Sequence, residues 1–280
     1  MSLLSFVKAH ARGNDFLVIE ERVMREPGAQ GRHAALARKL CSRNTSIGAD
    51  GIEFVDRRAD GSIFLRLFNA DGSEAELSGN GTRCVAAWLA QSEGLEQVDL
   101  GTHGGVRRCK LVRREGREWW IESAMGVPRV MPRAIEIEGV NGPIQGAMVN
   151  VGNPHFVIFP EAEDFSSHGM TWQQLGAKIA VDPLFRFGTN VEFVRVKSEN
   201  EIEFRIFERG CGPTTSSGTG TCASSSAAMT LRGVARKLTA LAEGGEQFVE
   251  WPDASAEMML TGPAEIICTG TAEVDFEVLR

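Results

Sequence analysis

The chain of 280 residues contains no tyrosine, which removes one of the usual general acids and bases from the candidates. Its six cysteines show no Cys-x-x-Cys spacing, so the sequence predicts neither a metal site nor a secreted disulfide framework. The N-terminus lacks a basic start followed by an apolar run, so no signal peptide is expected. Apolar runs stay far below the roughly 18 residues of a membrane span. We therefore expect a cytoplasmic protein with no membrane partner.

The charge balance is acidic, with a formal net charge of -7 and a sequence pI near 5.4. A protein that binds nucleic acid through its surface is usually basic, so no nucleic-acid partner is expected. Hydrophobic residues make up 42% of the chain, which is enough for one large core or two medium ones. The composition thus fits a soluble globular protein.

Two glycine-rich segments dominate what is present. Residues 68–88 read FNADGSEAELSGNGTRCVAAW, and residues 207–227 read FERGCGPTTSSGTGTCASSSA. In each segment, Ser-Gly-x-Gly-Thr begins ten residues after the phenylalanine and opens a run of small residues typical of a helix. Ser78 and Ser217 occupy equivalent positions, 139 residues apart.

The same offset of 139 recurs elsewhere in the chain. The further matches are Gly13-Asn14 with Gly152-Asn153, Val18-Ile19 with Val157-Ile158, Glu53-Phe54-Val55 with Glu192-Phe193-Val194, and Arg66 with Arg205. An offset this long excludes a solenoid repeat and indicates an internal duplication.

The duplication predicts an α+β fold of two pseudo-symmetric domains. Each is expected to be a mostly antiparallel, β-barrel-like sheet wrapped around a central helix. The expected domains are residues 1–127 plus 266–280 and residues 128–265, with the proline-rich stretch 128–143 as the crossover. Apolar spacing predicts a helix over residues 30–42, and further helices are expected over residues 79–91, 170–179 and 218–231. A ligand site is expected at the cleft where two related halves meet.

The two Ser-Gly-x-Gly-Thr segments predict a carboxylate site. Free backbone N–H groups and the helix dipole favour an anion at a helix N-terminus. Two such ends could hold one carboxylate and stabilise charge that develops on it. Alternatively, each serine is simply an N-cap.

Other polar residues fall at strand ends or in glycine-rich turns, namely Asn14, Asn69, Asn153, Asn190, Glu208 and Arg209. Together they offer amide groups, a carboxylate and a guanidinium, which suit a small zwitterion, although each asparagine alone is a common turn former. His155 follows Asn153 and Pro154 and could orient a catalytic group, or it could be a surface histidine.

These motifs resemble the diaminopimelate epimerase family over nearly the whole chain. The resemblance rests on the following segments: Gly13-Asn14-Asp15-Phe16, Gly48-Ala49-Asp50-Gly51, Phe68-Asn69-Ala70-Asp71-Gly72-Ser73-Glu74, Gly79-Asn80-Gly81-Thr82-Arg83-Cys84, Gly152-Asn153-Pro154-His155, Gly188-Thr189-Asn190-Val191, Glu208-Arg209-Gly210, Gly218-Thr219-Gly220 and Thr261-Gly262-Pro263-Ala264. It implies two pseudo-symmetric domains, no cofactor, a possible homodimer, and interconversion of L,L- and meso-diaminopimelate for lysine and cell-wall synthesis.

The resemblance also implies roles for single residues. Asn69, Asn153, Asn190 and Arg209 would hold the distal amino-acid end of the substrate, with Asn14 among the substrate-binding residues. Gly79, Asn80, Gly218 and Thr219 would hold the reacting carboxylate. His155 and Glu208 would support proton transfer and bind the α-amino group.

The chain departs from the family pattern where the resemblance places the chemistry. The family uses two cysteine thiols, and Ser78 and Ser217 stand at those positions. A serine hydroxyl is a far weaker acid than a thiol and needs a neighbouring base. Cys84 and Cys222 lie about one and a half turns further along each helix and are expected to pack.

Three interpretations remain open: an epimerase with both cysteines replaced, a divergent amino-acid isomerase or dehydratase close to the proline racemase-like group, and a non-catalytic amino-acid-binding protein.

Overall fold

The computed structural model describes residues 2–279. The chain forms two compact units, and each is described by itself. Unit 1 comprises Met1–Ser123 with Gly262–Arg280, and unit 2 comprises Ala124–Thr261. The chain passes from unit 1 to unit 2 after Ser123 and returns after Thr261, and this spacing is close to the 139-residue offset of the sequence repeat. The sequence-based boundaries, after residues 127 and 265, lie a few residues beyond them.

Unit 1 is a ring of eight strands in the order β1-β2-β3-β4-β6-β7-β8-β17, with β17 pairing back onto β1. The β2–β3 and β4–β6 pairs are parallel and the other registered pairs are antiparallel. The strands are β1 (Ser2–Ala11), β2 (Asn14–Glu20), β3 (Gly51–Arg57), β4 (Ile63–Asn69), β6 (Gln97–Thr102), β7 (Gly105–Glu115), β8 (Glu118–Ala124) and β17 (Met259–Val274), with the short β5 (Glu74–Ala75) beside β4.

Unit 2 repeats this arrangement in the order β9-β10-β11-β12-β13-β15-β16-β17. Its parallel pairs, β11–β12 and β13–β15, are the equivalents of β2–β3 and β4–β6. The strands are β9 (Arg129–Ile135), β10 (Ile144–Asn150), β11 (Pro154–Ile158), β12 (Asn190–Ser198), β13 (Glu201–Glu208), β15 (Lys237–Ala242) and β16 (Gly245–Glu250), with β14 (Gly212–Thr214) beside β13.

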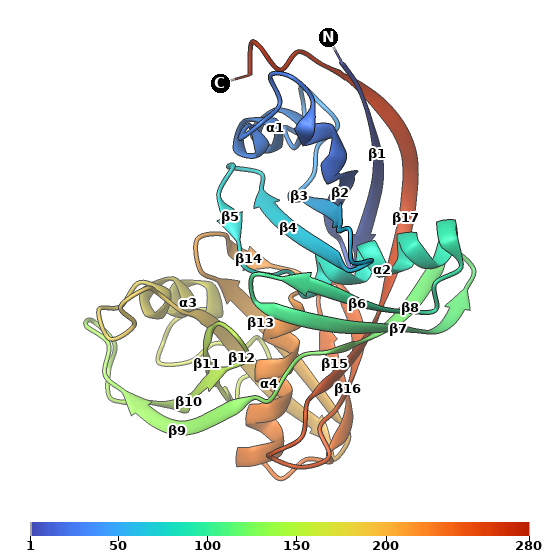
Figure 1. Ribbon diagram of the computed structural model, residues 1–280. Coiled ribbons are helices and arrows are strands. Elements are labelled where there is room, and N and C mark those ends of the chain that lie inside the picture. The colour runs from blue at the N-terminus through green and yellow to red at the C-terminus, as the bar shows by residue number, and fades with distance from the viewer. Residues whose placement is uncertain (1, 280) are drawn as a thin grey trace. The chain divides into compact units, whose positions relative to one another are not determined.

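One helix runs through each ring and another packs outside it (Figure 1). The inner helices are α2 (Gly79–Glu93) and α4 (Gly218–Leu231), and their small residues fit the narrow interior of the strand rings. The outer helices are α1 (His33–Leu40) and α3 (Trp172–Ala180), and a short 3-10 helix, η1 (Glu21–Arg25), precedes α1. Each unit therefore has an inner core around its central helix and a second core beneath its outer helix.

The side chains of strand β3 contribute to both cores of unit 1. Successive side chains of a strand point to opposite faces. Ile52 and Phe54 pack in the core beneath α1, whereas Val55 packs in the core around α2. Glu53, between Ile52 and Phe54, therefore points with Val55 toward α2, and it is 1% exposed.

The predicted fold class is confirmed: two related α+β units, each a mostly antiparallel sheet around a central helix. The starts of α2 and α4 differ by 139 residues, as do those of β3 and β12. Among the described residues, no helix combines the length and the apolar character needed to cross a membrane.

Two sequence-based expectations were wrong in part. Residues 128–143 were expected to be only a crossover, but Arg129–Ile135 forms β9 and pairs with β10. Proline is disfavoured inside strands, yet Pro132 lies opposite Ala147 in this pairing. The helix expected over residues 30–42 is shorter, because Gly31 has a left-handed φ of 70° that ends helical geometry on its side.

Candidate functional site

Ser78 is the N-cap of α2. Its Oγ accepts a hydrogen bond from the backbone N–H of Gly81 at 3.0 Å. The hydroxyl of Thr82 donates to the carbonyl of Gly79 at 3.0 Å. The serine oxygen thus satisfies one of the backbone donors that a helix start leaves open, and its own O–H can still donate to a ligand.

Ser217 caps α4 in the same way. Its Oγ accepts from the N–H of Gly220 at 3.2 Å, and Thr221 donates to its carbonyl at 2.8 Å. Ser217 is 8% exposed. Both helix ends therefore combine a serine hydroxyl with the positive end of a helix dipole, which favours a negatively charged group.

His155 lies inside unit 2, with both ring nitrogens engaged. Its Nδ1 is 2.6 Å from Glu192 Oε1, and its Nε2 is 2.9 Å from Asn153 Oδ1. An amide oxygen only accepts, so Nε2 carries a proton, and a second proton is shared between Nδ1 and Glu192. Asn153 in turn donates from Nδ2 to Thr219 Oγ1 at 3.4 Å. The result is a chain of hydrogen bonds from the buried Glu192, through the half-buried Asn153, to the first turn of α4.

The pKa of Glu192 lies above its usual value. Burial raises this pKa by more than the charge of His155 and its hydrogen bond lower it. His155 and Glu192 are 1% and 0% exposed. A buried ion pair without such bonding would be costly, so the shared proton explains how both groups tolerate the interior.

A second cluster of predicted residues lies at the start of α2. Asn14 donates from Nδ2 to Asp50 Oδ2 at 2.7 Å and accepts from Asn80 Nδ2 at 3.1 Å. Arg83 Nη2 donates to Asn80 Oδ1. Arg43 bridges Asp50 and the neighbouring Asp15 at 2.7 Å each. The cluster fixes the amides of Asn14 and Asn80 beside the capped helix end.

Asp15 stabilises the same cluster as an ionised carboxylate. Burial acts to raise its pKa, but hydrogen bonds and charges from Arg43 and Lys8 lower it below the usual value. Asn69 adjoins the group through its strand, since the next residue, Ala70, donates its N–H to the Asp50 carbonyl at 2.9 Å. The Asn69 side chain donates to Ser73 Oγ within its own turn.

Asn190, Arg209 and Glu208 form a third group, in unit 2. Asn190 Oδ1 accepts from the N–H of Arg209 at 2.9 Å, and its Nδ2 donates to the Pro154 carbonyl at 3.3 Å. Arg209 Nη1 donates to the Phe187 carbonyl at 2.7 Å. Glu208 Oε1 accepts from Thr214 Oγ1 at 2.6 Å. These bonds tie the end of β13 to the start of β12, beside His155.

Cys84 and Cys222 pack as expected. Both are fully buried, Cys84 in the core around α2 and Cys222 in the core around α4. Burial raises the pKa of the Cys84 thiol well above its usual value. A thiol of this kind is a poor nucleophile and a poor base at neutral pH.

The sequence reasoning missed Glu53 and Glu192 as site residues. They belong to one of the segments that revealed the duplication, but their strands otherwise read as apolar. Both carboxyls reach the first turn of a capped helix: Glu53 Oε1 lies 1.9 Å from where a side chain on Gly81 would begin, and Glu192 Oε1 lies 3.2 Å from the equivalent point at Gly220. The signal that could have drawn attention to them is the recurrence of a glutamate at equivalent positions of two apolar strands, whereas their burial is visible only in the structure.

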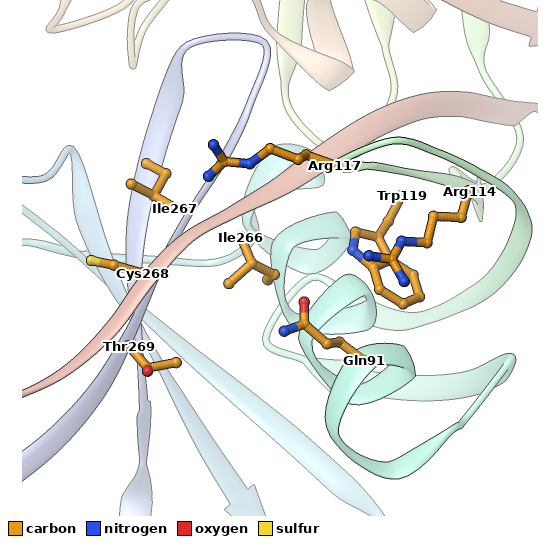
Figure 2. A pocket seen from close by; sticks show the side chains of 8 residues that line it. All are labelled: Gln91, Arg114, Arg117, Trp119, Ile266, Ile267, Cys268 and Thr269. Carbon is orange, nitrogen blue, oxygen red and sulfur yellow. The ribbon is translucent and has the colours of Figure 1, made fainter.

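A cavity of about 340 Å³ on unit 1 is separate from these clusters. Figure 2 shows its lining, in which Arg114 and Trp119 lie together on one side and Cys268 lies on the other. Arg117, also in the lining, pairs with Glu265 at 2.9 Å. None of the predicted site residues lines this cavity.

Two solved structures share the fold over nearly the whole chain. The PhzF-family phenazine biosynthesis protein of Bacillus anthracis covers 98% of this chain and 100% of its own, with a TM-score of 0.75 and 14% identity. The hydroxyproline epimerase of Agrobacterium vitis, with bound trans-4-hydroxy-L-proline, covers 96% and 92%, with a TM-score of 0.73 and 15% identity. The chain therefore has the fold that these two proteins share.

The sequence comparisons identify the family. The family model described as diaminopimelate epimerase matches residues 6–131 and 147–267. The diaminopimelate epimerase of Desulforudis audaxviator is 36% identical over 285 residues, covering 95% of this chain and 98% of that protein. That of Moorella thermoacetica is 33% identical over 287 residues, covering 97% and 100%. The chain belongs to the diaminopimelate epimerase family of isomerases.

Proposed function

We propose that this chain is an isomerase that interconverts L,L- and meso-diaminopimelate by moving a proton at the α-carbon, in lysine and cell-wall synthesis. The observation that carries the proposal is the pair of serine-capped helix starts, at Ser78 and Ser217, each beside asparagine side chains that suit an amino acid. Family membership supports the substrate class. The cytoplasmic location and the homodimer implied by the resemblance remain predictions.

The helix starts would bind the carboxylate next to the reacting carbon. Each offers backbone N–H groups and a hydroxyl that can donate, and charge that develops during α-proton removal would be stabilised there. Asn69, Asn153, Asn190 and Arg209 would hold the distal end of the substrate, and Asn14 would hold Asn80 in place. Glu208 would take the α-amino group, because a carboxylate accepts hydrogen bonds from an ammonium group.

Proton transfer is the demanding step, because Ser78 and Ser217 stand where the resemblance places two thiols. A serine hydroxyl acts as a base only with a neighbouring group to take its proton. On the unit 2 side, hydrogen bonds from Glu192 through His155 and Asn153 reach Thr219, two residues from Ser217, and orient the start of α4. An amide does not carry a proton, so these bonds position groups and do not deprotonate Ser217. The proposed isomerase is therefore slow compared with a thiol enzyme.

Hydrogen exchange at the α-carbon tests the proposal. The protein is incubated with L,L-diaminopimelate in D2O, and deuterium incorporation and the appearance of the meso form are followed by mass and chiral chromatography. We expect slow exchange by the wild type and much faster exchange by the double variant Ser78→Cys plus Ser217→Cys. If neither protein binds diaminopimelate, the substrate assignment is wrong.

A second candidate is an amino-acid-binding protein without turnover. It is favoured by one observation: both serine oxygens already accept a backbone hydrogen bond as N-caps, which is all that a structural role requires. Binding of diaminopimelate without exchange in the wild type, measured over days, would support it. Exchange with proline or hydroxyproline, but not with diaminopimelate, would instead indicate a divergent isomerase of the proline racemase-like type.

A further inference from the structure

Glu53 is a buried carboxyl in direct contact with the first turn of α2. A side chain on Gly81 would begin 1.9 Å from Glu53 Oε1 and 2.9 Å from its Cδ. Gly81 is also the residue whose N–H donates to Ser78 Oγ. The carboxyl and the serine hydroxyl therefore flank the same glycine at the helix start.

The Glu53 carboxyl is incompletely bonded. Its Oε1 is fully buried and has no hydrogen-bond partner among the residues that the structure describes. A buried polar atom in this state costs free energy that a native structure rarely tolerates without a reason. A functional reason would be that this carboxyl gains and loses a proton beside a helix start that favours anions.

The duplication supplies a direct comparison. Glu192, the equivalent of Glu53, pairs with His155 at 2.6 Å. In unit 1 the position equivalent to His155 is Phe16, and β2 and β3 keep the parallel register of β11 and β12. Phenylalanine cannot share a proton, so Glu53 must carry its own proton in order to be neutral.

The surroundings of Glu53 offer little to stabilise its charge. Burial is the one cause of its shifted pKa, and β4 presents Leu65 and Leu67 to the same core. The neighbouring Cys84 thiol feels the charges of Arg83, Asp15 and Glu53 itself. Burial alone raises the pKa of Glu53 to about 8. Near neutral pH the group is mostly a neutral acid, and a second negative charge nearby would hold it so at higher pH as well.

We propose that Glu53 is a positioning residue of the α2 start, which must carry a proton whenever a ligand carboxylate is held there, so that ligand binding is coupled to proton uptake from solvent. The proposal rests on the proposed function, because the ligand is the carboxylate of a diaminopimelate-like amino acid. It makes the two units chemically unequal: unit 2 shares a proton between two groups, and unit 1 stores one on a single carboxyl.

Calorimetry tests the coupling. L,L-diaminopimelate is titrated into the wild type and into Glu53→Gln at pH 7 and pH 9, each in two buffers of different ionisation enthalpy, which yields the number of protons taken up. The ligand and the other side chains contribute equally to the proton uptake of both proteins. The difference in proton uptake between the wild type and Glu53→Gln is therefore the contribution of Glu53. We expect a difference of about one proton per ligand at pH 9 and close to none at pH 7.

Affinity gives a second readout. Above pH 8 the wild type should lose affinity relative to Glu53→Gln by up to about tenfold per pH unit. Glu96→Gln, which removes an exposed carboxyl of the same unit, should behave like the wild type. Glu53→Asp keeps a titratable group and should keep the coupling. A merely structural role would leave the proton number unchanged.

The outcomes separate the two proposals. Binding with the same proton uptake in the wild type and in Glu53→Gln overturns the role of Glu53 and leaves the proposed function intact. Absence of binding in every variant overturns both. In the free protein, the infrared C=O band of a protonated carboxyl should disappear in Glu53→Gln, and persistence of an unchanged band also contradicts the proposal.

Discussion

His155 Nδ1 and Glu192 Oε1 lie 2.6 Å apart, inside the strand ring of unit 2, where neither side chain is exposed. The equivalent positions of unit 1 hold Phe16 and Glu53. The two units thus solve the same problem, a carboxyl buried beside a helix start, in different ways. This difference allows each unit to serve as the control for the other.

His155→Phe gives unit 2 the residue found in unit 1. Glu192 then loses its partner, and Asn153 loses the bond from Nε2. We expect the free energy of unfolding to fall by about 3 kcal/mol at pH 8, as for breaking other buried pairs. The pKa of Glu192 should rise further, so the loss should be smaller at pH 5, where the carboxyl is easily protonated. Urea unfolding at both pH values measures this, and an equal loss at the two would contradict it.

Glu53→Gln should raise the free energy of unfolding at neutral and mildly alkaline pH, whereas His155→Phe should lower it. The pKa of Glu53 is raised from 4.5 to about 8 in the folded protein, so above pH 4.5 the unfolded chain releases a proton that the folded chain retains. The wild type therefore loses roughly 1.4 kcal/mol per pH unit from this group between about pH 4.5 and pH 8. The glutamine variant lacks this loss.

The melting temperature of Glu53→Gln, relative to that of the wild type, should therefore increase as the pH rises from 5 to 8. Glu96→Gln serves as the exposed control. Parallel pH profiles for the wild type and Glu53→Gln would show that Glu53 is ionised in the folded protein.

Gly81→Ala should be strongly destabilising, because its new methyl group would begin 1.9 Å from Glu53 Oε1. We expect a loss of about 2–3 kcal/mol, the usual cost of overpacking. Combining it with Glu53→Ala removes the clash, so the double variant should lose less than the sum of the single variants. Additive losses in this double-mutant cycle would place the strain elsewhere.

Ser78→Ala and Ser217→Ala should each cost about 1 kcal/mol of stability through loss of an N-cap. Threonine at either position should restore most of it, because it is also a capping residue. Chemical unfolding of the four variants checks this. Alanine variants as stable as the wild type would mean that the observed bonds from Gly81 and Gly220 contribute little.

The sequence revealed the repeat of the fold because the two halves keep one constant residue offset. The offset that relates Ser78 to Ser217 also relates the two central helices. The N-caps followed from the preference of serine for helix starts. Strand β9 was missed because proline, here Pro132, is unfavourable in most strands. Such a position depends on tertiary neighbours, which local preference cannot reveal.

Of the candidate site, the local clusters were partly predictable. Asn153 and His155 are close in sequence, and the structure joins them. The contribution of Glu192 depends on the parallel pairing of β11 with β12, and that of Glu53 on which face of β3 meets α2. A glutamate in an apolar run carries no local sign of whether it points into the core or away from it.

Strand β17 has a consequence for how the molecule is made. The ring of unit 1 closes only when Glu265–Val274 pairs with β1, from His10↔Glu265 to Ser2↔Val274. Unit 2 is contiguous in the chain, at Ala124–Thr261. On the ribosome, unit 1 cannot close until residues 265–274 have been made, whereas all of unit 2 has been synthesised by Thr261. Until then β1 pairs with β2 alone and its other edge is open, so the unit that begins first is completed second.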